Sequence, residues 1–110
     1  MQTLHEQHCI PVPAGSPELD SDNITIYLEK LEHWQLHPDS KICRDIHFDN
    51  FSQTMQFVNA IAEIAVQQDH HPVITLGYDY CHVCYRTESI KGLTQNDFIC
   101  AAKIEHLLVD

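Results

Sequence analysis

The 110-residue chain carries a formal net charge of −10, because 16 Asp and Glu residues outnumber 6 Lys and Arg residues. This acidic balance repels nucleic-acid phosphates and anionic membrane surfaces, so we expect neither as a partner. No apolar run approaches the ~20 residues that a membrane-spanning helix needs. The N-terminal sequence also lacks the basic start and apolar stretch of a signal peptide. We therefore expect a cytoplasmic protein with one small domain.

The first 18 residues are predicted to form an irregular N-terminal arm, and residues 19–110 a single domain. The arm is punctuated by residues that interrupt regular structure, namely Pro11, Pro13, Gly15 and Pro17. The domain begins with a predicted helix near 20–32, for which Asp20 or Ser21 can provide the N-cap.

Two further helices and four strands are predicted in the rest of the domain. Apolar residues at helical spacing predict helices over 51–69 and 94–108, the second starting with Thr94 and Asp97 as a weak capping box. Alternating residues and intervening turns predict strands near 34–37, 42–48, 73–79 and 82–88. This order predicts an α+β fold with three helices on one face of a four-stranded antiparallel sheet. Its open sheet edges and small size favour a homodimer or homotetramer.

The five cysteines are an odd number without a secretion signal, which predicts free thiols in a reducing compartment. Cys81 and Cys84 have the spacing of a C-x2-C metal motif, but on a strand they face opposite sides of the sheet. No second pair of ligands lies nearby in the sequence. We therefore expect no metal site and no cofactor.

The stretch DHHP, residues 69–72, is the main candidate for a functional site. Pro72 ends the preceding helix, because a residue before proline is pushed out of α geometry. His70 and His71 therefore stand at a helix-to-strand corner. Two interpretations remain open: solvated histidines stabilised by the helix dipole, or two imidazoles aimed into one cleft, where they exchange protons near neutral pH.

Motifs along nearly the whole chain resemble the pterin-4a-carbinolamine dehydratase family. Tyr78 stands six residues after Pro72, and Asp97 lies within the segment GLTQNDFICAAKIE. Trp34 and the segment HCIPVPAGSPELDSD also match the family. The pattern IxRxxxFxxF comprises Ile42, Arg44, Phe48 and Phe51. The resemblance implies the family's α+β fold, in agreement with the order of predicted elements.

The resemblance also implies a reaction and a set of roles. Members of that family remove water from a 4a-hydroxytetrahydropterin and regenerate the quinonoid dihydropterin without a metal. By the motif, His70 is a catalytic acid or base, and Asp97 orients a histidine or the pterin ring, although Asp97 can equally be a helix cap. His71, Pro72 and Tyr78 are the implied substrate-binding residues.

The chain departs from the family's pattern at three positions. Glu88 stands where the family has a further catalytic histidine, Val66 replaces an acidic residue, and Ile74 replaces a frequent tryptophan. An ionised carboxylate cannot donate a proton at pH 7, and losing a positioned acid or base costs ~10²–10⁴ in rate.

These departures favour a degenerate site on a retained scaffold. The function we expect from the sequence is a non-catalytic binding or assembly factor, such as a RuBisCO assembly chaperone of the carboxysome, with a protein client or a pterin as its partner. The alternative is an active 4a-hydroxytetrahydrobiopterin dehydratase, with Glu88 in the place of the missing histidine.

Overall fold

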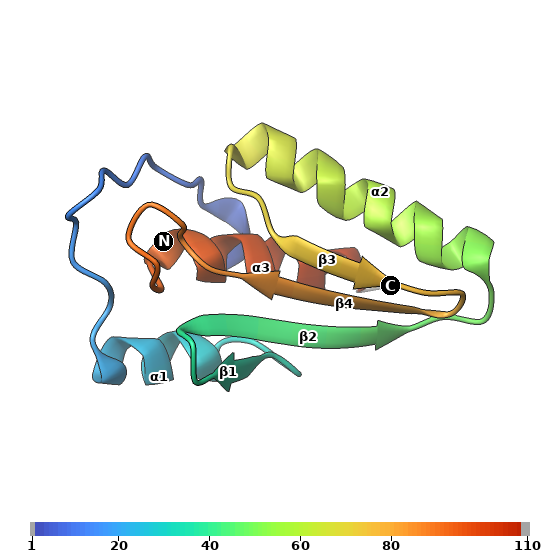
Figure 1. Cartoon of the computed structure of the whole chain (residues 1–110), viewed down its shortest axis with the longest axis horizontal. Coiled ribbons are helices and arrows are strands. Elements are labelled where there is room, and N and C mark those ends of the chain that lie inside the picture. Colours follow the sequence, from blue (N-terminus) through green and yellow to red (C-terminus); the bar gives the residue numbers. More distant parts are fainter. Residues whose placement is uncertain (1, 109–110) are drawn as a thin grey trace.

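The computed structural model describes residues 2–108 and contains one four-stranded antiparallel sheet. The strand order is β1-β2-β4-β3, with β1 (Gln35–His37), β2 (Lys41–His47), β3 (Val73–Leu76) and β4 (Tyr80–Tyr85). The three α-helices are α1 (Ser21–Glu29), α2 (Phe51–Gln68) and α3 (Gln95–Leu107). Figure 1 shows α3 behind the strands and the long α2 alongside β3. The predicted α+β fold and its α-β-β-α-β-β-α order are confirmed.

The predicted strands of the second hairpin, 73–79 and 82–88, are shifted relative to the structure. The Gly77 amide donates to the Tyr80 carbonyl at 3.0 Å, so the turn comes at Tyr78 and Asp79 and β4 begins at Tyr80. Gly77 suits this turn, because a Cβ there would collide with the Tyr80 ring. At its other end β4 stops at Tyr85 and the chain folds into a turn that the alternation pattern did not reveal.

The first helix is shorter than the predicted 20–32. Asp20 is its N-cap and accepts a hydrogen bond from the Asn23 amide, as predicted, but the helix ends at Glu29. The amides of Lys30 and Leu31 then bond to carbonyls only three residues back, which is the tight geometry of a closing turn.

The N-terminal arm is tied to the domain by a short 3-10 helix and by side-chain hydrogen bonds. The 3-10 helix η1 (Leu4–Glu6) packs on α3 and buries Leu4 in the core. Further along, Asn96 of α3 bonds both backbone groups of Ile10, at 3.0 and 2.6 Å, and Gln68 of α2 accepts from the Cys9 amide at 2.8 Å. The arm is therefore held across the ends of both helices.

The two faces of the sheet have different surroundings. Ile42, Ile46 and Val83 alternate onto the face that packs against the helices and join the hydrophobic core. Cys43 and Cys84 lie on the other face, directly opposite each other in the register of β2 and β4 with Cα atoms 4.1 Å apart.

The prediction that all five cysteines are free thiols is wrong for two of them. The structure joins Cys43 and Cys84 in a disulfide. The antiparallel register brings together two cysteines that are 41 residues apart in the sequence. Spacing along one strand could not reveal this pairing. Cys81 lies in the core on the opposite face from Cys84, as strand geometry predicts for C-x2-C residues, and with Cys9 and Cys100 it is free.

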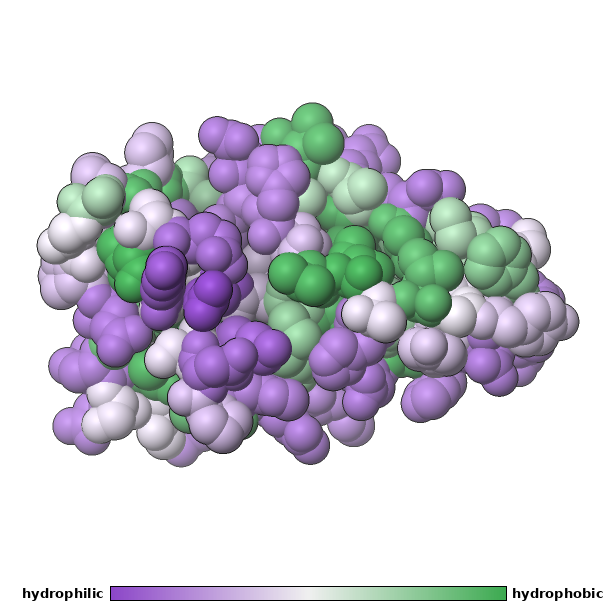
Figure 2. Space-filling model, in the orientation of Figure 1, coloured by the Kyte–Doolittle hydropathy of each residue, from purple (hydrophilic) through white to green (hydrophobic). Residues whose placement is uncertain are grey.

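The outer edges of the sheet are β1 and β3. Figure 2 shows apolar residues gathered over the region of β3 and the adjoining side of α2, and β3 itself exposes Val73 and Leu76. The predicted homodimer or homotetramer would cover such an edge and stays a prediction. Among the described helices, none is long and apolar enough to cross a membrane.

The helix-to-strand corner depends on one residue in a left-handed conformation. Asp69 closes α2 with φ 50° and ψ 44°, and the amide of His70 donates back to the Ala65 carbonyl at 3.1 Å. A left-handed residue at this position is a common way to end a helix, and aspartate tolerates it better than most residues do. This ending turns the chain so that His70 leaves the helix axis.

We expect the side chain at position 69 to affect stability through this backbone conformation. Asp69→Val should lower the free energy of unfolding by ~1–3 kcal/mol, because a β-branched residue is strained in the left-handed region. Asp69→Gly should stay within about 1 kcal/mol of wild type, because glycine adopts this region freely. Urea unfolding of the three proteins measures the difference. Equal stabilities of the Val and Gly variants would contradict this account of the corner.

Candidate functional site

A buried histidine–aspartate pair forms the centre of the site. His70 Nε2 lies 2.6 Å from Asp97 Oδ1, which joins the end of α2 to the first turn of α3. The Asp97 side chain is 0% exposed and that of His70 is 11% exposed. Asp97 engages Nε2, so Nδ1 is the ring nitrogen that this carboxylate leaves free.

Asp97 is held by two donors besides His70. Its Oδ2 accepts from the Thr94 amide at 2.9 Å and from Thr87 Oγ1 at 2.8 Å. The first bond belongs to the capping box of α3, so the predicted capping role and the orienting role of Asp97 coexist. A buried carboxylate without partners would be costly, and these bonds fix its orientation toward His70.

The side chain of Tyr85 supports His70 from the end of β4. The two rings stack with their centroids 5.2 Å apart and their planes inclined by 15°. The Tyr85 hydroxyl donates to the backbone carbonyl of His70 at 3.2 Å. Tyr85 is fully buried, so it restricts both the ring and the backbone of the histidine.

The surroundings of His70 shift its pKa. Burial alone lowers the pKa of an imidazole, but the hydrogen bond and the negative charge of Asp97 outweigh burial and raise the pKa of His70 above its ordinary value. The imidazolium form is therefore more populated near neutral pH than in an isolated histidine. His70 is suited to donate a proton and to recover it afterwards.

The histidine pair lines a cavity of about 380 Å³. His70 and His71 come from the corner after α2, Arg86 and Glu88 from the chain after β4, and Ile10–Val12 from the N-terminal arm. An adjoining cavity of about 230 Å³ shares three of these residues and extends along β3 and β4. Together they form a cleft of the size usual for small-molecule sites.

Glu88 lines this cleft with His70. The predicted strand 82–88 extends too far, because β4 ends at Tyr85 and Glu88 belongs to the following turn. His82, Cys84, Arg86 and Glu88 nevertheless line the adjoining cavity together. Both Glu88 carboxylate oxygens accept from the Arg86 guanidinium at 3.2 Å. The side chain is 67% exposed, so this ion pair stands at the mouth of the cleft.

The structure does not bring Tyr78 to the cleft. Tyr78 is 65% exposed in the turn between β3 and β4, where its carbonyl accepts from Thr54 near the start of α2. His70 follows the other end of this 18-residue helix, ~27 Å away at 1.5 Å per residue. Pro72 is half-buried and is not part of either cavity wall.

Sequence reasoning missed the residues that support the histidine–aspartate pair. Thr87 meets Asp97, and Tyr85 meets His70, only when β4 and α3 pack against the corner. The buried position of Tyr85 follows from strand alternation, but nothing in the sequence indicated a buried threonine bound to Asp97. The arm was taken for an irregular segment, although residues 10–12 form part of the cavity wall.

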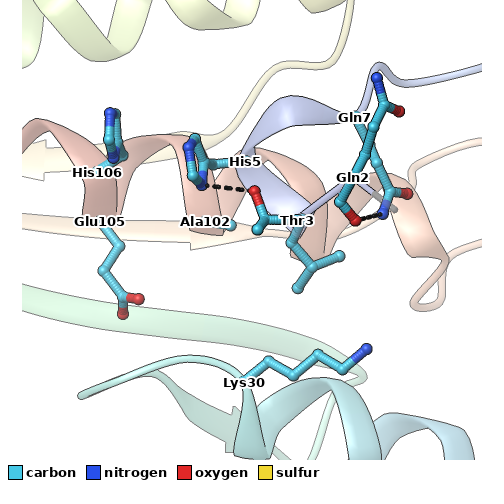
Figure 3. Close-up of a pocket in the computed structure, with 9 residues that line it drawn as sticks. Gln2, Thr3, His5, Gln7, Lys30, Ala102, Glu105 and His106 are labelled. Atoms are coloured by element: carbon cyan, nitrogen blue, oxygen red, sulfur yellow. Dashed lines mark hydrogen bonds between the residues drawn. The ribbon is translucent and has the colours of Figure 1, made fainter.

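A larger cavity of about 520 Å³ lies elsewhere, between the N-terminal segment, Lys30 and the end of α3 (Figure 3). It contains the stacked rings of His5 and His106. Its carboxylate, Glu105, is already bound to the Glu32 amide at 2.6 Å and lies 3.6 Å from Arg44. Volume alone does not make it the site, because the buried titratable pair is in the other cleft.

The chain matches a family model over most of its length. Residues 17–107 match the model of pterin 4 alpha carbinolamine dehydratase. A protein from Nitrosomonas europaea, named "Putative pterin-4-alpha-carbinolamine dehydratase", is 48% identical over 105 residues, which are 94% of this chain and 92% of that protein.

Two solved structures share the fold. A transcriptional coactivator/pterin dehydratase from Brucella melitensis superposes with a TM-score of 0.81 at 28% identity, over 84% of this chain and 100% of the other. A pterin dehydratase-like protein, described as a RuBisCO assembly factor in the alpha-carboxysome, gives 0.60 at 20% identity, over 69% of this chain and 89% of the other. This second likeness extends to the fold alone. The family match and the close relative together place this chain in the pterin 4 alpha carbinolamine dehydratase family.

Proposed function

We propose that this protein is an active dehydratase of 4a-hydroxytetrahydropterins. The observation that carries the proposal is the His70–Asp97 pair, buried at 2.6 Å in the wall of a cleft that also contains His71. Family membership supplies the reaction class, and the pair supplies a group able to transfer protons near neutral pH. We thus favour the alternative that the sequence left open over a non-catalytic role.

The reaction requires two proton transfers. The bond from C4a to the hydroxyl oxygen breaks as that oxygen takes a proton and leaves as water, and the ring nitrogen loses a proton as it forms a double bond to C4a. In this proposal His70, with its pKa raised by Asp97, protonates the leaving hydroxyl. His71 and Glu88 line the same cavity and are candidates to accept the proton of the ring nitrogen.

Glu88 does not make the site inactive on this account. A carboxylate is a poor donor at neutral pH, but it can accept a proton. The acid step belongs to His70, so the residue at position 88 needs only to receive a proton. The pair with Arg86 keeps the Glu88 oxygens at the cleft mouth, within the same cavity wall as the histidines.

The expected role in RuBisCO assembly has little support in this chain. The assembly factor resembles the chain at 20% identity, and such a likeness extends to the fold alone. Fold likeness does not transfer a protein client. A histidine held by a buried carboxylate favours chemistry instead, because a docking surface does not need such a pair.

One prediction of this proposal concerns His70 and Asp97. His70→Ala should lower kcat/KM for a 4a-hydroxytetrahydropterin by ~10²–10⁴, because it removes the positioned acid. Asp97→Asn should retain part of the activity. It should also move the limb of the pH-rate profile that reports His70 to lower pH, because the negative charge that raises the pKa of His70 is lost. Steady-state rates of water elimination between pH 5 and 9 provide both values.

A matched control is His47→Ala, which removes an exposed histidine from β2 outside the cleft. This variant should keep wild-type kinetics. The dehydratase proposal fails if the wild-type protein does not accelerate the reaction, or if His70→Ala and His47→Ala have equal rates.

Another prediction of this proposal separates the possible roles of Glu88. If Glu88 accepts a proton, Glu88→Gln should lower kcat by at least ~10-fold, because the amide keeps the shape and loses the basic group. Glu88→His should match or exceed wild type, because imidazole titrates near neutrality. The same assay measures both variants. Unchanged kcat in Glu88→Gln would assign the acceptor role to His71 instead.

A further inference from the structure

The sheet face opposite the helices carries a second cluster of chemically active side chains. Cys43, His82 and Cys84 each place one metal-ligating atom within 4.8 Å of the other two. The register of β2 and β4 explains the cluster, because Cys43 pairs with Cys84 and Asp45 with His82 on the same face. None of these residues belongs to the His70–Asp97 pair, although His82 and Cys84 line the smaller cavity that adjoins it.

The His82 ring is oriented as in a metal site. Its Nδ1 lies 2.5 Å from Asp45 Oδ1, and its Nε2 lies 3.2 Å from Cys84 Sγ. A carboxylate bound to one ring nitrogen fixes the ring and directs the other nitrogen at a metal, which is the usual outer arrangement around zinc-bound histidines. Here the directed nitrogen faces the two sulfurs.

The distances between these atoms suit a tetrahedral ion. Zinc binds thiolate sulfur at ~2.3 Å and imidazole nitrogen at ~2.0–2.1 Å, so two ligand atoms on one zinc ion lie ~3.5–3.8 Å apart. His82 Nε2 lies 3.2 Å from Cys84 Sγ, slightly below that range, while the two sulfurs are closer still because the disulfide joins them. Once the disulfide is reduced and the sulfurs separate, small side-chain rotations bring the two sulfurs and His82 Nε2 to the separations that zinc requires.

We propose that Cys43, Cys84 and His82 bind one Zn²⁺ ion when the disulfide between the two cysteines is reduced, with the fourth position open to water. The His82 side chain is 37% exposed, which leaves room for this water. In the disulfide state the sulfurs are bonded to each other and cannot act as thiolates. Metal binding at this face is therefore governed by the redox state of one cysteine pair.

The chemistry balances with a dithiol or phosphine as the reductant. Two electrons break the sulfur–sulfur bond and two protons give two thiols. A dithiol supplies both electrons and both protons and becomes its own disulfide, whereas a phosphine supplies the electrons and becomes its oxide as water supplies the oxygen and the two protons. Zn²⁺ then binds as both thiols release their protons. Oxidation by disulfide exchange reverses the sequence and expels the ion.

Cys81 is not part of this site, although its spacing from Cys84 is that of a metal motif. Its side chain is fully buried on the helix-facing side of the sheet. Cys84 uses a partner on the neighbouring strand instead. Cys81 therefore provides a matched control, because it is a cysteine of β4 that points toward the helices and away from the proposed zinc site.

The test is a Zn²⁺ titration of the full chain reduced with a phosphine, against a chromophoric chelator. We expect one tight site per chain, and at least ~100-fold weaker binding after the disulfide is reformed. Titration with Co²⁺ should give the near-ultraviolet band of thiolate coordination and the visible bands of a tetrahedral ion. Circular dichroism shows whether each variant is folded.

Variants assign the ligands. Cys43→Ser and His82→Ala should each weaken Zn²⁺ binding at least ~10-fold, and Asp45→Asn should weaken it ~10–100-fold through the orientation of His82. Cys81→Ala should leave affinity and the cobalt spectrum unchanged. The proposal is overturned if reduced wild type binds no tighter than Cys43→Ser, if Cys81→Ala abolishes the thiolate band, or if the disulfide resists reduction in the folded protein.

Discussion

The hydrogen bond between His70 and Asp97 is the constraint around which the site is organised. Asp97 has no exposed surface, so its charge is stabilised only by the groups that donate to it. Those groups come from the corner after α2, the turn after β4 and the cap of α3. If any one of these segments moves away, the buried Asp97 carboxylate loses a hydrogen-bond partner. Packing of the three segments and the acid–base chemistry thus depend on the same atoms.

The sheet assigns different chemistry to its two faces through strand alternation. Along β4, Cys81, Val83 and Tyr85 face the helices, and Tyr85 extends this packing to the ring of His70. The intervening His82 and Cys84 face away, where β2 supplies Cys43 and Asp45. One short strand therefore supports the proton-transfer pair through Tyr85 and presents the thiol–imidazole cluster on its other face, where His82 and Cys84 border the adjoining cavity with His71 and Glu88.

Local signals predicted the fold, whereas the roles of His70 and Asp97 came from the resemblance to the family. The end of α2 at DHHP and the cap at Thr94 are each visible in a few consecutive residues. Cys43 with Cys84, Thr87 with Asp97, and the arm at Ile10 with Asn96 depend on distant segments meeting. Strand register and turn positions decide those meetings, and the turn from Thr87 to Gly92 has no clear sequence signature. The same turn places Glu88 at the cleft, whereas the alternating pattern of the sequence predicted that Glu88 lies on a strand.

The most direct measurement of the central claim is the location of pterin binding in solution. Amide chemical shifts of the labelled protein, followed during titration with 7,8-dihydrobiopterin, report which residues a pterin touches. The account predicts the largest changes at His70, His71 and Thr87, and their loss in Asp97→Asn if the variant remains folded. Changes centred on Lys30 and His106, around the larger cavity, would contradict it, as would the absence of any change at millimolar ligand.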